Sequence, residues 1–401
     1  MTLASRLDRL RGCATASGPA PLQRGIECLR RGQLSTAERP QRSATLAGDL
    51  GAECSADGLL IRSREYRLPA SGFRREDLSR LPEVCDLAAP EWIYIDTETT
   101  GLSSGVGNLA FMVGLARYGC GQLLEVRQYL LGSFAAEVSM LREVFEGLGP
   151  NAVLVSYNGK CFDLPLLIGR LRMHRIDADP ATLPHLDLMY GVRRAYRSHW
   201  PDCRLQTAEK RLLGLHRVGD MPGAEAPAAW QAWLREGATK PLLRVLEHNY
   251  QDVASLALLH QRLLRDYAGC RQPGLDHAAI GKAWRDAGQD QLARRVWESA
   301  GSLLDDQGSL QLAALYRQQR QWSLAVAVWA RLHAHGSALA ALELSKYYEH
   351  RKHDYQTAMK FAWDCDAAER EVRVTRLQGK IGRNLQLPLV PYPVTVSPRG
   401  L

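Results

Sequence analysis

A short apolar run that ends in two closely spaced carboxylates constrains this chain more than any other feature. Trp92–Ile95 is typical of a buried strand, and Asp96 and Glu98 come directly after it. Because side chains alternate along a strand, both carboxylates point to the same face. Two like charges held this close repel each other unless a cation lies between them. The pattern indicates a site for a hard divalent cation. A solvated acidic strand end is the simpler interpretation of the pair taken alone.

Two further acidic signals lie downstream in the chain. Asp163 follows an Asn158-Gly159 turn and begins a predicted helix, where a lone carboxylate is best explained as a helix cap. His248 and Asp252 lie four residues apart in another predicted helix, so they share one face. A local His–Asp surface pair explains that spacing as well as a functional site does.

In their order along the chain, these signals resemble the motifs of the DEDD family of 3′–5′ exonucleases, which have the ribonuclease-H-like fold. The resemblance assigns metal binding to four carboxylates, Asp96, Glu98, Asp163 and Asp252. It implies two divalent metal ions, Mg²⁺ or Mn²⁺, and makes His248 the residue that orients or deprotonates the attacking water. It assigns substrate contacts to Thr99, Leu102 and Asn158. Core packing explains Leu102 equally well, and a plain turn explains Asn158.

Shorter motifs place the resemblance in the YprB-type branch of that family. They are Thr99-Thr100-Gly101-Leu102, Phe111-x-Val113-Gly114, His185-x-Asp187-Leu188 and Pro222-Gly223. The common histidine subclass leaves four residues between His and Asp, whereas this chain leaves three, as the tyrosine subclass does. His185 and Asp187 are either extra ligands or supporting residues, and we favour the supporting role.

The segments around these motifs predict a mixed α/β domain. Strands are expected at 59–68, 92–95, 109–118, 123–130, 152–156 and 185–188, and helices at 135–148, 163–173 and 241–267, with a loop over 219–227. The short connection between the third and fourth of these strands predicts antiparallel neighbours. Three adjacent strands followed by alternating helices and strands indicate a layered α/β fold.

Beyond residue 274 the pattern is helical and repetitive. Aromatic residues recur at a spacing of 32 residues in two sets, Trp284, Tyr316, Tyr348 and Trp297, Trp329, Phe361. The spacing resembles tetratricopeptide repeats, in which each unit is a helix pair. The predicted fold is therefore an α/β ribonuclease-H-like mixed-sheet domain followed by an all-α helical-repeat domain.

The predicted organisation has five parts. They are a disordered basic arm (1–45), a lead-in segment with a short β strand (46–90), a ribonuclease-H-like exonuclease domain (91–268), helical repeats (274–372) and an extended tail (373–401). The chain has 401 residues and a formal net charge of +8, which fits a polyanionic partner without establishing one. No apolar run reaches the ~20 residues that span a bilayer, and no secretory signal is recognisable, so we expect a cytoplasmic protein.

The sequence thus predicts a metal-dependent 3′–5′ exonuclease acting on nucleic acid. The resemblance favours DNA over RNA, implies a role in DNA repair, and implies a protein partner for the repeats, such as a helicase. The alternative is a catalytically weak ribonuclease-H-like module that binds nucleic acid while its repeats scaffold other proteins. The intact set of four carboxylates and His248 favours the enzyme.

Overall fold

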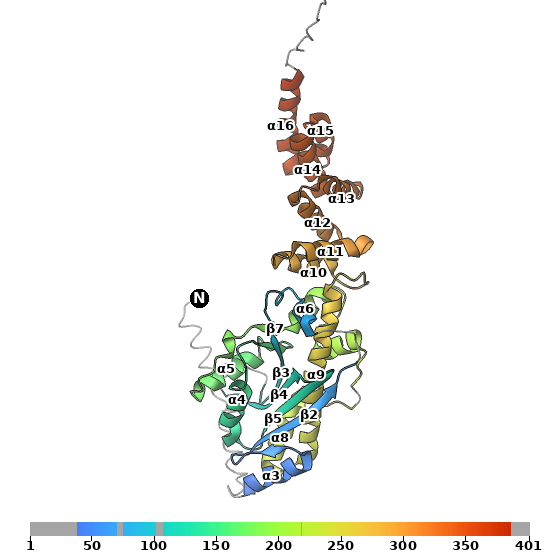
Figure 1. Ribbon diagram of the computed structural model, residues 1–401. Helices are drawn as coiled ribbons and strands as arrows, with labels where there is room; N and C mark the ends of the chain where they lie inside the picture. The colour runs from blue at the N-terminus through green and yellow to red at the C-terminus, as the bar shows by residue number, and fades with distance from the viewer. Residues whose placement is uncertain (1–37, 70–74, 102–106, 218, 386–401) are drawn as a thin grey trace, which may run out of the picture. The chain divides into compact units, whose positions relative to one another are not determined.

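The computed structural model describes residues 38–69, 75–101, 107–217 and 219–385 (Figure 1). These residues form two compact units. One unit comprises the described residues before 80 together with 86–191 and 203–262, and the other comprises 80–85, 192–202 and the described residues from 263 onward. The predicted domain boundaries stay predictions.

The first unit is built on a mixed sheet of seven strands within the described residues, in the order β1-β2-β5-β4-β3-β6-β7. The strands are β1 Glu53–Cys54, β2 Leu59–Arg67, β3 Glu91–Thr99, β4 Ala110–Tyr118, β5 Leu123–Leu131, β6 Ala152–Ser156 and β7 His185–Asp187. Strands β2, β5, β4 and β3 pair antiparallel, whereas β6 runs parallel to both β3 and β7. The predicted antiparallel pair, β4 and β5, and the predicted mixed sheet are confirmed.

Of the described α-helices in the first part of the chain, one precedes these strands, two lie between β5 and β7, and four follow β7. They are α3 Glu38–Leu50, α4 Glu137–Phe145, α5 Asp163–Met173, α6 Leu188–Tyr196, α7 Leu205–Ala208, α8 Ala226–Glu236 and α9 Thr239–Tyr267. The core lies where the sheet meets α3, α4, α5, α8 and α9. Trp230 of α8 stacks on Phe111 of β4, with ring centroids 5.0 Å apart, and its indole N–H donates to the Leu131 carbonyl at 2.8 Å. Burial of these large aromatic surfaces stabilises the packing of α8 on the sheet.

Two expectations near the sheet need correction. Residues 38–45, which the sequence analysis assigned to the disordered arm, begin helix α3, because Ser43, Leu46 and Ala47 are buried and anchor that helix in the core. The loop expected over 219–227 ends earlier, since a short 3₁₀ turn at Gly223–Glu225 leads directly into α8. Residues 1–37 of the arm lie outside the described residues.

The second unit is all-helical from residue 277 to 385, as predicted. Its helices are α10 His277–Asp286, α11 Asp290–Ala300, α12 Asp306–Gln318, α13 Trp322–Ala334, α14 Ala338–Tyr347, α15 Tyr355–Trp363 and α16 Ala367–Leu385. The periodic aromatics fill the helix pairs: Trp297 of α11 donates to the Ala278 carbonyl of α10 at 3.3 Å, and Tyr348 and Phe361 stack with centroids 5.6 Å apart. The tetratricopeptide assignment itself stays a prediction.

The tail expected to be extended from residue 373 is wrong for residues 373–385, which belong to α16. That part of the chain is helical because Arg373, Val374 and Leu377 are buried against the preceding helices. Residues 386–401 lie outside the described residues. Among the helices that the structure describes, none combines the length and the apolarity needed to cross a membrane.

Candidate active site

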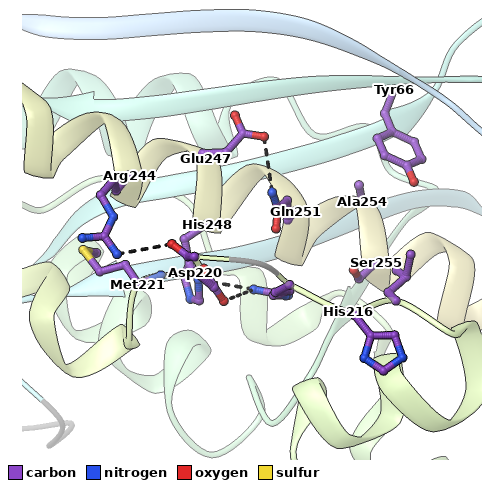
Figure 2. Close-up of a pocket in the computed structure, with 13 residues that line it drawn as sticks. Tyr66, His216, Asp220, Met221, Arg244, Glu247, His248, Gln251, Ala254 and Ser255 are labelled. Carbon is purple, nitrogen blue, oxygen red and sulfur yellow. Dashed lines mark hydrogen bonds and ion pairs between the residues drawn. The ribbon is translucent and has the colours of Figure 1, made fainter.

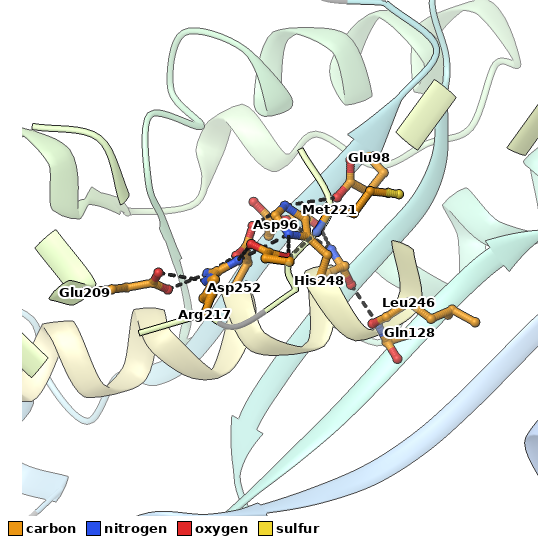
Figure 3. A network of polar contacts seen from close by, with 11 residues as sticks. Asp96, Glu98, Gln128, Glu209, Arg217, Met221, Leu246, His248 and Asp252 are labelled. Carbon is orange, nitrogen blue, oxygen red and sulfur yellow. Dashed lines mark hydrogen bonds and ion pairs between the residues drawn. The ribbon is translucent and has the colours of Figure 1, made fainter. Parts of the chain in front are cut away.

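Strand β3 and helix α9 bring the first two carboxylates of the site together (Figure 3). The Asn249 amide of α9 donates to Asp96 Oδ2 at 3.0 Å, and His248 Nε2 lies 3.9 Å from Glu98 Oε1. Both carboxylates therefore face α9, as the alternation of side chains along the strand predicted. Glu98 is only 8% exposed, so a solvated strand end is excluded as its explanation.

Helix α9 approaches the sheet this closely because Gly114 has no side chain. Gly114 of β4 is the register partner of Asp96, and an added Cβ would collide with the Asn249 amide and would lie 2.7 Å from Val253 Cγ2. Asn249 is fully buried, and its carbonyl accepts a hydrogen bond from Gln128 at 3.1 Å. Glycine at this position thus allows α9 to support the Asp96 carboxylate. Sequence reasoning missed Asn249.

The third carboxylate comes from the turn between β6 and α5. Asn158 has a φ of +68°, a left-handed conformation that asparagine tolerates well. The chain then enters α5 at Asp163, whose carboxylate accepts a hydrogen bond from the Thr97 hydroxyl of β3. Strand β6 pairs with β3 only as far as Tyr94, so the end of β3 is left open to Asp163. The structure thus gives Asn158 a turn role, and its assignment to substrate stays a prediction.

Asp187 holds that turn in place. Its carboxylate accepts backbone N–H bonds from Asn158 at 2.7 Å, from Lys160 at 3.2 Å and from Met189 at 3.1 Å. A carboxylate with three backbone donors is committed to the local backbone. His185, the first residue of β7, forms a hydrogen bond through Nε2 with the hydroxyl of Ser156 at 2.7 Å, and Ser156 ends β6 just before that turn. Both residues therefore support the turn that carries Asp163.

Helix α9 supplies the fourth carboxylate and the histidine, one helical turn apart. Asp252 Oδ2 lies 3.4 Å from His248 Nε2, which also faces Glu98. The other ring nitrogen, Nδ1, lies 2.7 Å from Asp220 Oδ1. Arg217 also lies 3.3 Å from Nδ1 and can only donate, but the Asp220 contact is shorter. Because an ionised carboxylate only accepts, we assign a proton to Nδ1, and Nε2 is then directed toward the acidic side chains. Asp220 was not singled out from the sequence, because it lies in a segment without periodicity.

Arg217 is a third residue that the sequence did not predict. Its guanidinium forms an ion pair with Asp252, and it lies 2.5 Å from Glu209 Oε1 and 3.2 Å from Asp220 Oδ2 (Figure 3). Burial would lower the pKa of Arg217, but Asp252 and Glu209 raise it, so the guanidinium stays charged. Arg217 is thus a resident cation beside the acidic cluster.

A pocket of about 350 Å³ opens beside this histidine (Figure 2). Its labelled lining includes Tyr66, His216, Asp220, Met221, Arg244, His248 and Gln251. Six lining residues, from Arg244 to Ser255, come from α9, and most of the others come from the segment that carries Arg217 and Asp220. His248 and Asp220 are therefore next to open space on one side and to the carboxylates on the other.

The acidic cluster shifts the pKa values of its members upward. Burial, followed by the charges of Asp252 and Asp163, raises the pKa of Asp96 well above its usual range. Burial and the charges of the other acids likewise raise the pKa of Glu98 to about 8, although His248 opposes them. Burial raises the pKa of Asp163 to about 6, and it raises the pKa of Asp252 despite His248 and Arg217. The four carboxylates lie within one another's field, and their negative charge is incompletely compensated.

The pKa of the histidine is also shifted upward, but for the histidine this favours the charged form. Burial would lower the pKa of His248, but the charge of Asp252 and the hydrogen bond to Asp220 raise it. The site therefore holds a basic imidazole among carboxylates that resist ionisation. Several strongly shifted pKa values in one cluster are typical of functional sites.

The carboxylates suit a hard divalent cation, because they are oxygen ligands with excess negative charge. Within residues 38–69, 75–101, 107–217 and 219–385, however, no three histidine, cysteine or acidic side chains are arranged as ligands around one point. Hydrogen bonds from Thr97 and Asn249 and the Arg217 ion pair engage three of the four carboxylates. The donor chemistry fits a metal site, and its assignment stays a proposal.

Other predicted residues lie less centrally or outside the description. The Thr99 hydroxyl donates to the Gly101 carbonyl at 2.9 Å, which is a local turn contact, and Leu102 is outside the described residues. Tyr250 lies between His248 and Asp252 in the sequence and is the other candidate for the base. It points away from the carboxylates, because its hydroxyl donates to the Glu65 carbonyl at 2.9 Å and its ring lies under Arg64.

Comparison with known proteins agrees with this geometry. A model of the RNase H superfamily matches residues 93–264, a range that contains all four carboxylates and His248. The chain is also 33% identical over 339 residues to YprB of Bacillus subtilis (strain 168), an uncharacterized protein, and the match covers 79% of this chain and 78% of that protein. This chain belongs to the same family as YprB, and its residues 93–264 form the predicted ribonuclease-H-like domain. The superfamily comprises nuclease-type domains, which act on nucleic acid and typically use divalent metal ions.

Proposed function

We propose that this protein is a metal-dependent 3′–5′ exonuclease that hydrolyses phosphodiester bonds, with DNA favoured over RNA and a role in DNA repair. The observation that supports it is the convergence of four carboxylates from β3, α5 and α9 beside His248. Charge repulsion among these groups lowers the stability of the folded chain, and binding of divalent metal ions would relieve that repulsion. A cytoplasmic location and a protein partner of the helical unit, such as a helicase, remain predictions from the resemblance.

The ligands proposed for two divalent metal ions, Mg²⁺ or Mn²⁺, are Asp96, Glu98, Asp163 and Asp252. Bound there, such ions would stabilise negative charge on the attacking and leaving oxygens. Asn249 and Thr97 orient two of these carboxylates through the hydrogen bonds described above. Oriented ligands lose less freedom when they bind, which is the role that supporting residues commonly have.

His248 is the group that we assign to the proton of the attacking water. Asp220 holds Nδ1, which leaves the lone pair of Nε2 directed at the carboxylate cluster. As the water oxygen bonds to phosphorus, one water proton passes to Nε2 and the phosphorus–O3′ bond breaks. The leaving O3′ takes up a proton from solvent, so the products are a nucleoside 5′-monophosphate and a shortened strand with a 3′-hydroxyl end. Tyr250 is excluded from this role by its contact with Glu65 on the other side of the helix.

Degradation of end-labelled oligonucleotides tests the proposal directly. Single- and double-stranded DNA and RNA, labelled at either end, are incubated with Mg²⁺, Mn²⁺ or excess EDTA. We expect stepwise shortening of 5′-labelled strands in the presence of a metal and none in EDTA. Cleavage that persists undiminished in EDTA, or internal cuts in place of shortening from the 3′ end, would contradict the proposal.

One observation favours the alternative, a nucleic-acid-binding module with weak or no catalysis. The Arg217 guanidinium already forms an ion pair with Asp252, so one of the four proposed metal ligands is engaged by a protein cation. Titration of Mn²⁺ followed by electron paramagnetic resonance separates the two functions. The exonuclease proposal requires the wild-type chain to bind Mn²⁺. The alternative requires binding to appear only in a variant such as Arg217→Gln.

A further inference from the structure

A buried carboxylate surrounded by cations lies in the all-helical unit, in a part of the chain that the proposed catalysis does not use. Glu349 belongs to a short π-helix, Tyr348–Lys352, and is 1% exposed. Its Oε2 lies 2.7 Å from both Arg373 and Arg376, and its Oε1 lies 2.9 Å from Lys380. Three cations share one anion, so this contact leaves positive charge uncompensated.

The cations continue along one face of α16. Arg373, Arg376, Lys380 and Arg383 follow at spacings of three and four residues, which places them on the same side of the helix. We define the α16 basic face as these four residues together with Arg351 and Lys352 of the π-helix. Residues 372–385 of α16 contain four of these basic residues and no acidic residue. Arg351, Lys352, Arg376 and Arg383 are exposed to solvent.

Flat aromatic rings accompany these cations. The Arg351 guanidinium lies over the Trp322 ring, 4.5 Å from its centroid, and the Lys380 ammonium lies 5.5 Å from the centroid of Tyr355. Trp322 in turn stacks on Tyr347, with centroids 5.7 Å apart. Basic side chains interleaved with aromatic rings are typical of surfaces that bind the backbone and bases of nucleic acid.

We propose that the α16 basic face binds nucleic acid through its phosphate backbone. The row from Arg373 to Arg383 extends for about 15 Å along the helix, and a nucleic acid strand presents a phosphate about every 3.4 Å along a duplex. A protein partner would instead favour a surface whose centre is apolar and poor in charge. The same chain carries a nuclease-type domain, which makes nucleic acid the polyanion that this face meets.

Glu349 has a defined part in this surface. By accepting hydrogen bonds from Arg376 and Lys380, it fixes two flexible side chains before a ligand arrives. Side chains that are already ordered lose less entropy on binding. The carboxylate neutralises only one of its three partners, so the ordered face stays cationic.

Fluorescence anisotropy of labelled oligonucleotides tests the inference with the full chain, in EDTA so that no strand is cut. The variant Arg351→Gln/Arg376→Gln/Arg383→Gln removes three exposed charges and leaves buried Arg373 in place. We expect its affinity for duplex DNA to fall at least about tenfold at low salt. The slope of log affinity against log salt should become less steep by about 2–3, since each phosphate contact contributes about 0.9.

The matched control, Lys282→Gln/Arg285→Gln/Arg295→Gln, removes the same charge from α10 and α11 and should change affinity less than about twofold. Replacing the same three arginines with lysine should restore the salt slope, because lysine keeps the charge. Equal losses in the glutamine triple and its control would overturn the proposal. The proposal would also be overturned if the glutamine triple variant kept its affinity for duplex DNA but lost its binding of polyglutamate, because the face would then bind an acidic protein. Absence of cleavage by the wild-type chain contradicts the proposed catalysis and leaves these binding outcomes unaffected.

Discussion

The two units each bury a cluster of charged side chains, and the two clusters are out of balance in opposite directions. At the end of β3, four carboxylates surround one histidine and one arginine, and the pKa of each carboxylate is raised, chiefly by burial and in Asp96 and Glu98 also by the other acids. Beside α16, three cations surround Glu349; burial alone would raise its pKa, but hydrogen bonds from Lys380 and Arg376 outweigh burial and lower it. One cluster has excess negative charge and the other has excess positive charge.

The difference shows what each cluster can bind. A buried group with too little opposite charge lowers the stability of the folded chain, and any ion that supplies the missing charge binds more tightly for that reason. The acidic cluster favours binding of a further cation, because Arg217 supplies only one positive charge beside four carboxylates. The α16 basic face calls for a polyanion, because its single buried anion is already shared among three cations.

The largest expected effect comes from removing a carboxylate from the acidic cluster. Asp96→Asn should slow cleavage by roughly 10⁴-fold, since a bound metal contributes several kcal/mol to transition-state stabilisation. In EDTA the same variant should unfold at a higher temperature than the wild type, because asparagine cannot ionise at a position where burial and the neighbouring acids oppose ionisation. Thermal unfolding with and without Mn²⁺ should show a stabilising shift for the wild type and little or none for the variant.

The control for that comparison is Asp177→Asn, an exposed aspartate of the same unit. It should match the wild type in rate and in its response to Mn²⁺. A wild-type cleavage rate in Asp96→Asn would show that the acidic cluster is not the metal site. A lower unfolding temperature of that variant in EDTA would show that the carboxylates do not repel one another in the folded chain.

The second effect distinguishes the two candidate bases on α9. His248→Ala should reduce the rate by about 10²–10⁴-fold, the usual contribution of a general base, with Mn²⁺ binding largely kept. Tyr250→Phe should change the rate little, because its hydroxyl bonds only the Glu65 carbonyl. Single-turnover kinetics on a 5′-labelled strand measures both variants. If Tyr250→Phe is the inactive one, the assignment of the base is wrong.

Local patterns predicted the parts of the acidic cluster that sit on regular elements. Alternation placed Asp96 and Glu98 on one face, and the helical period placed His248 one turn from Asp252. Helix α5 begins at Asp163, as the turn before it predicted. Such signals survive because the side chains that carry them belong to continuous strands and helices, whose geometry is fixed locally.

Asp220, Arg217 and Asn249 could not be predicted in the same way. Asp220 and Arg217 lie in a segment without periodicity, and they meet α9 only through tertiary pairing. Asn249 has no sequence signal that distinguishes it from other polar helix residues, because its role depends on the close approach of the strand at Gly114. In the other unit, the aromatic spacing predicted the helix pairs, whereas the charges of α16 resembled a solvated tail because the partner Glu349 lies 24 residues before Arg373.

The third effect is smaller and tests how His248 is held. Asp220→Asn keeps the size of the side chain but weakens the hydrogen bond to Nδ1, so Nε2 is less firmly directed at the carboxylates. We expect kcat to fall by about 10–100-fold, the usual cost of losing such a supporting contact, with KM little changed. Glu225→Gln, an exposed change nearby, is the matched control. A fall in substrate affinity with kcat unchanged would instead make Asp220 a substrate contact.

The smallest effect concerns stability and tests the sign of charge beside α16. Because the pKa of Glu349 is lowered in the folded chain, its ion pairs stabilise the fold at pH values above the unfolded pKa of about 4.3. That contribution is lost as the pH falls through the lower folded value.

Glu349→Gln should lower the unfolding temperature of the helical unit by roughly 5 °C at neutral pH. The difference from the wild type should stay constant down to about pH 5 and shrink at more acidic pH. Thermal unfolding of both proteins across this range measures it, with Glu371→Gln, an exposed change on α16, as the control. A difference that does not change with pH would mean that Glu349 stabilises by packing, and the contrast between the two clusters would then lose its electrostatic basis.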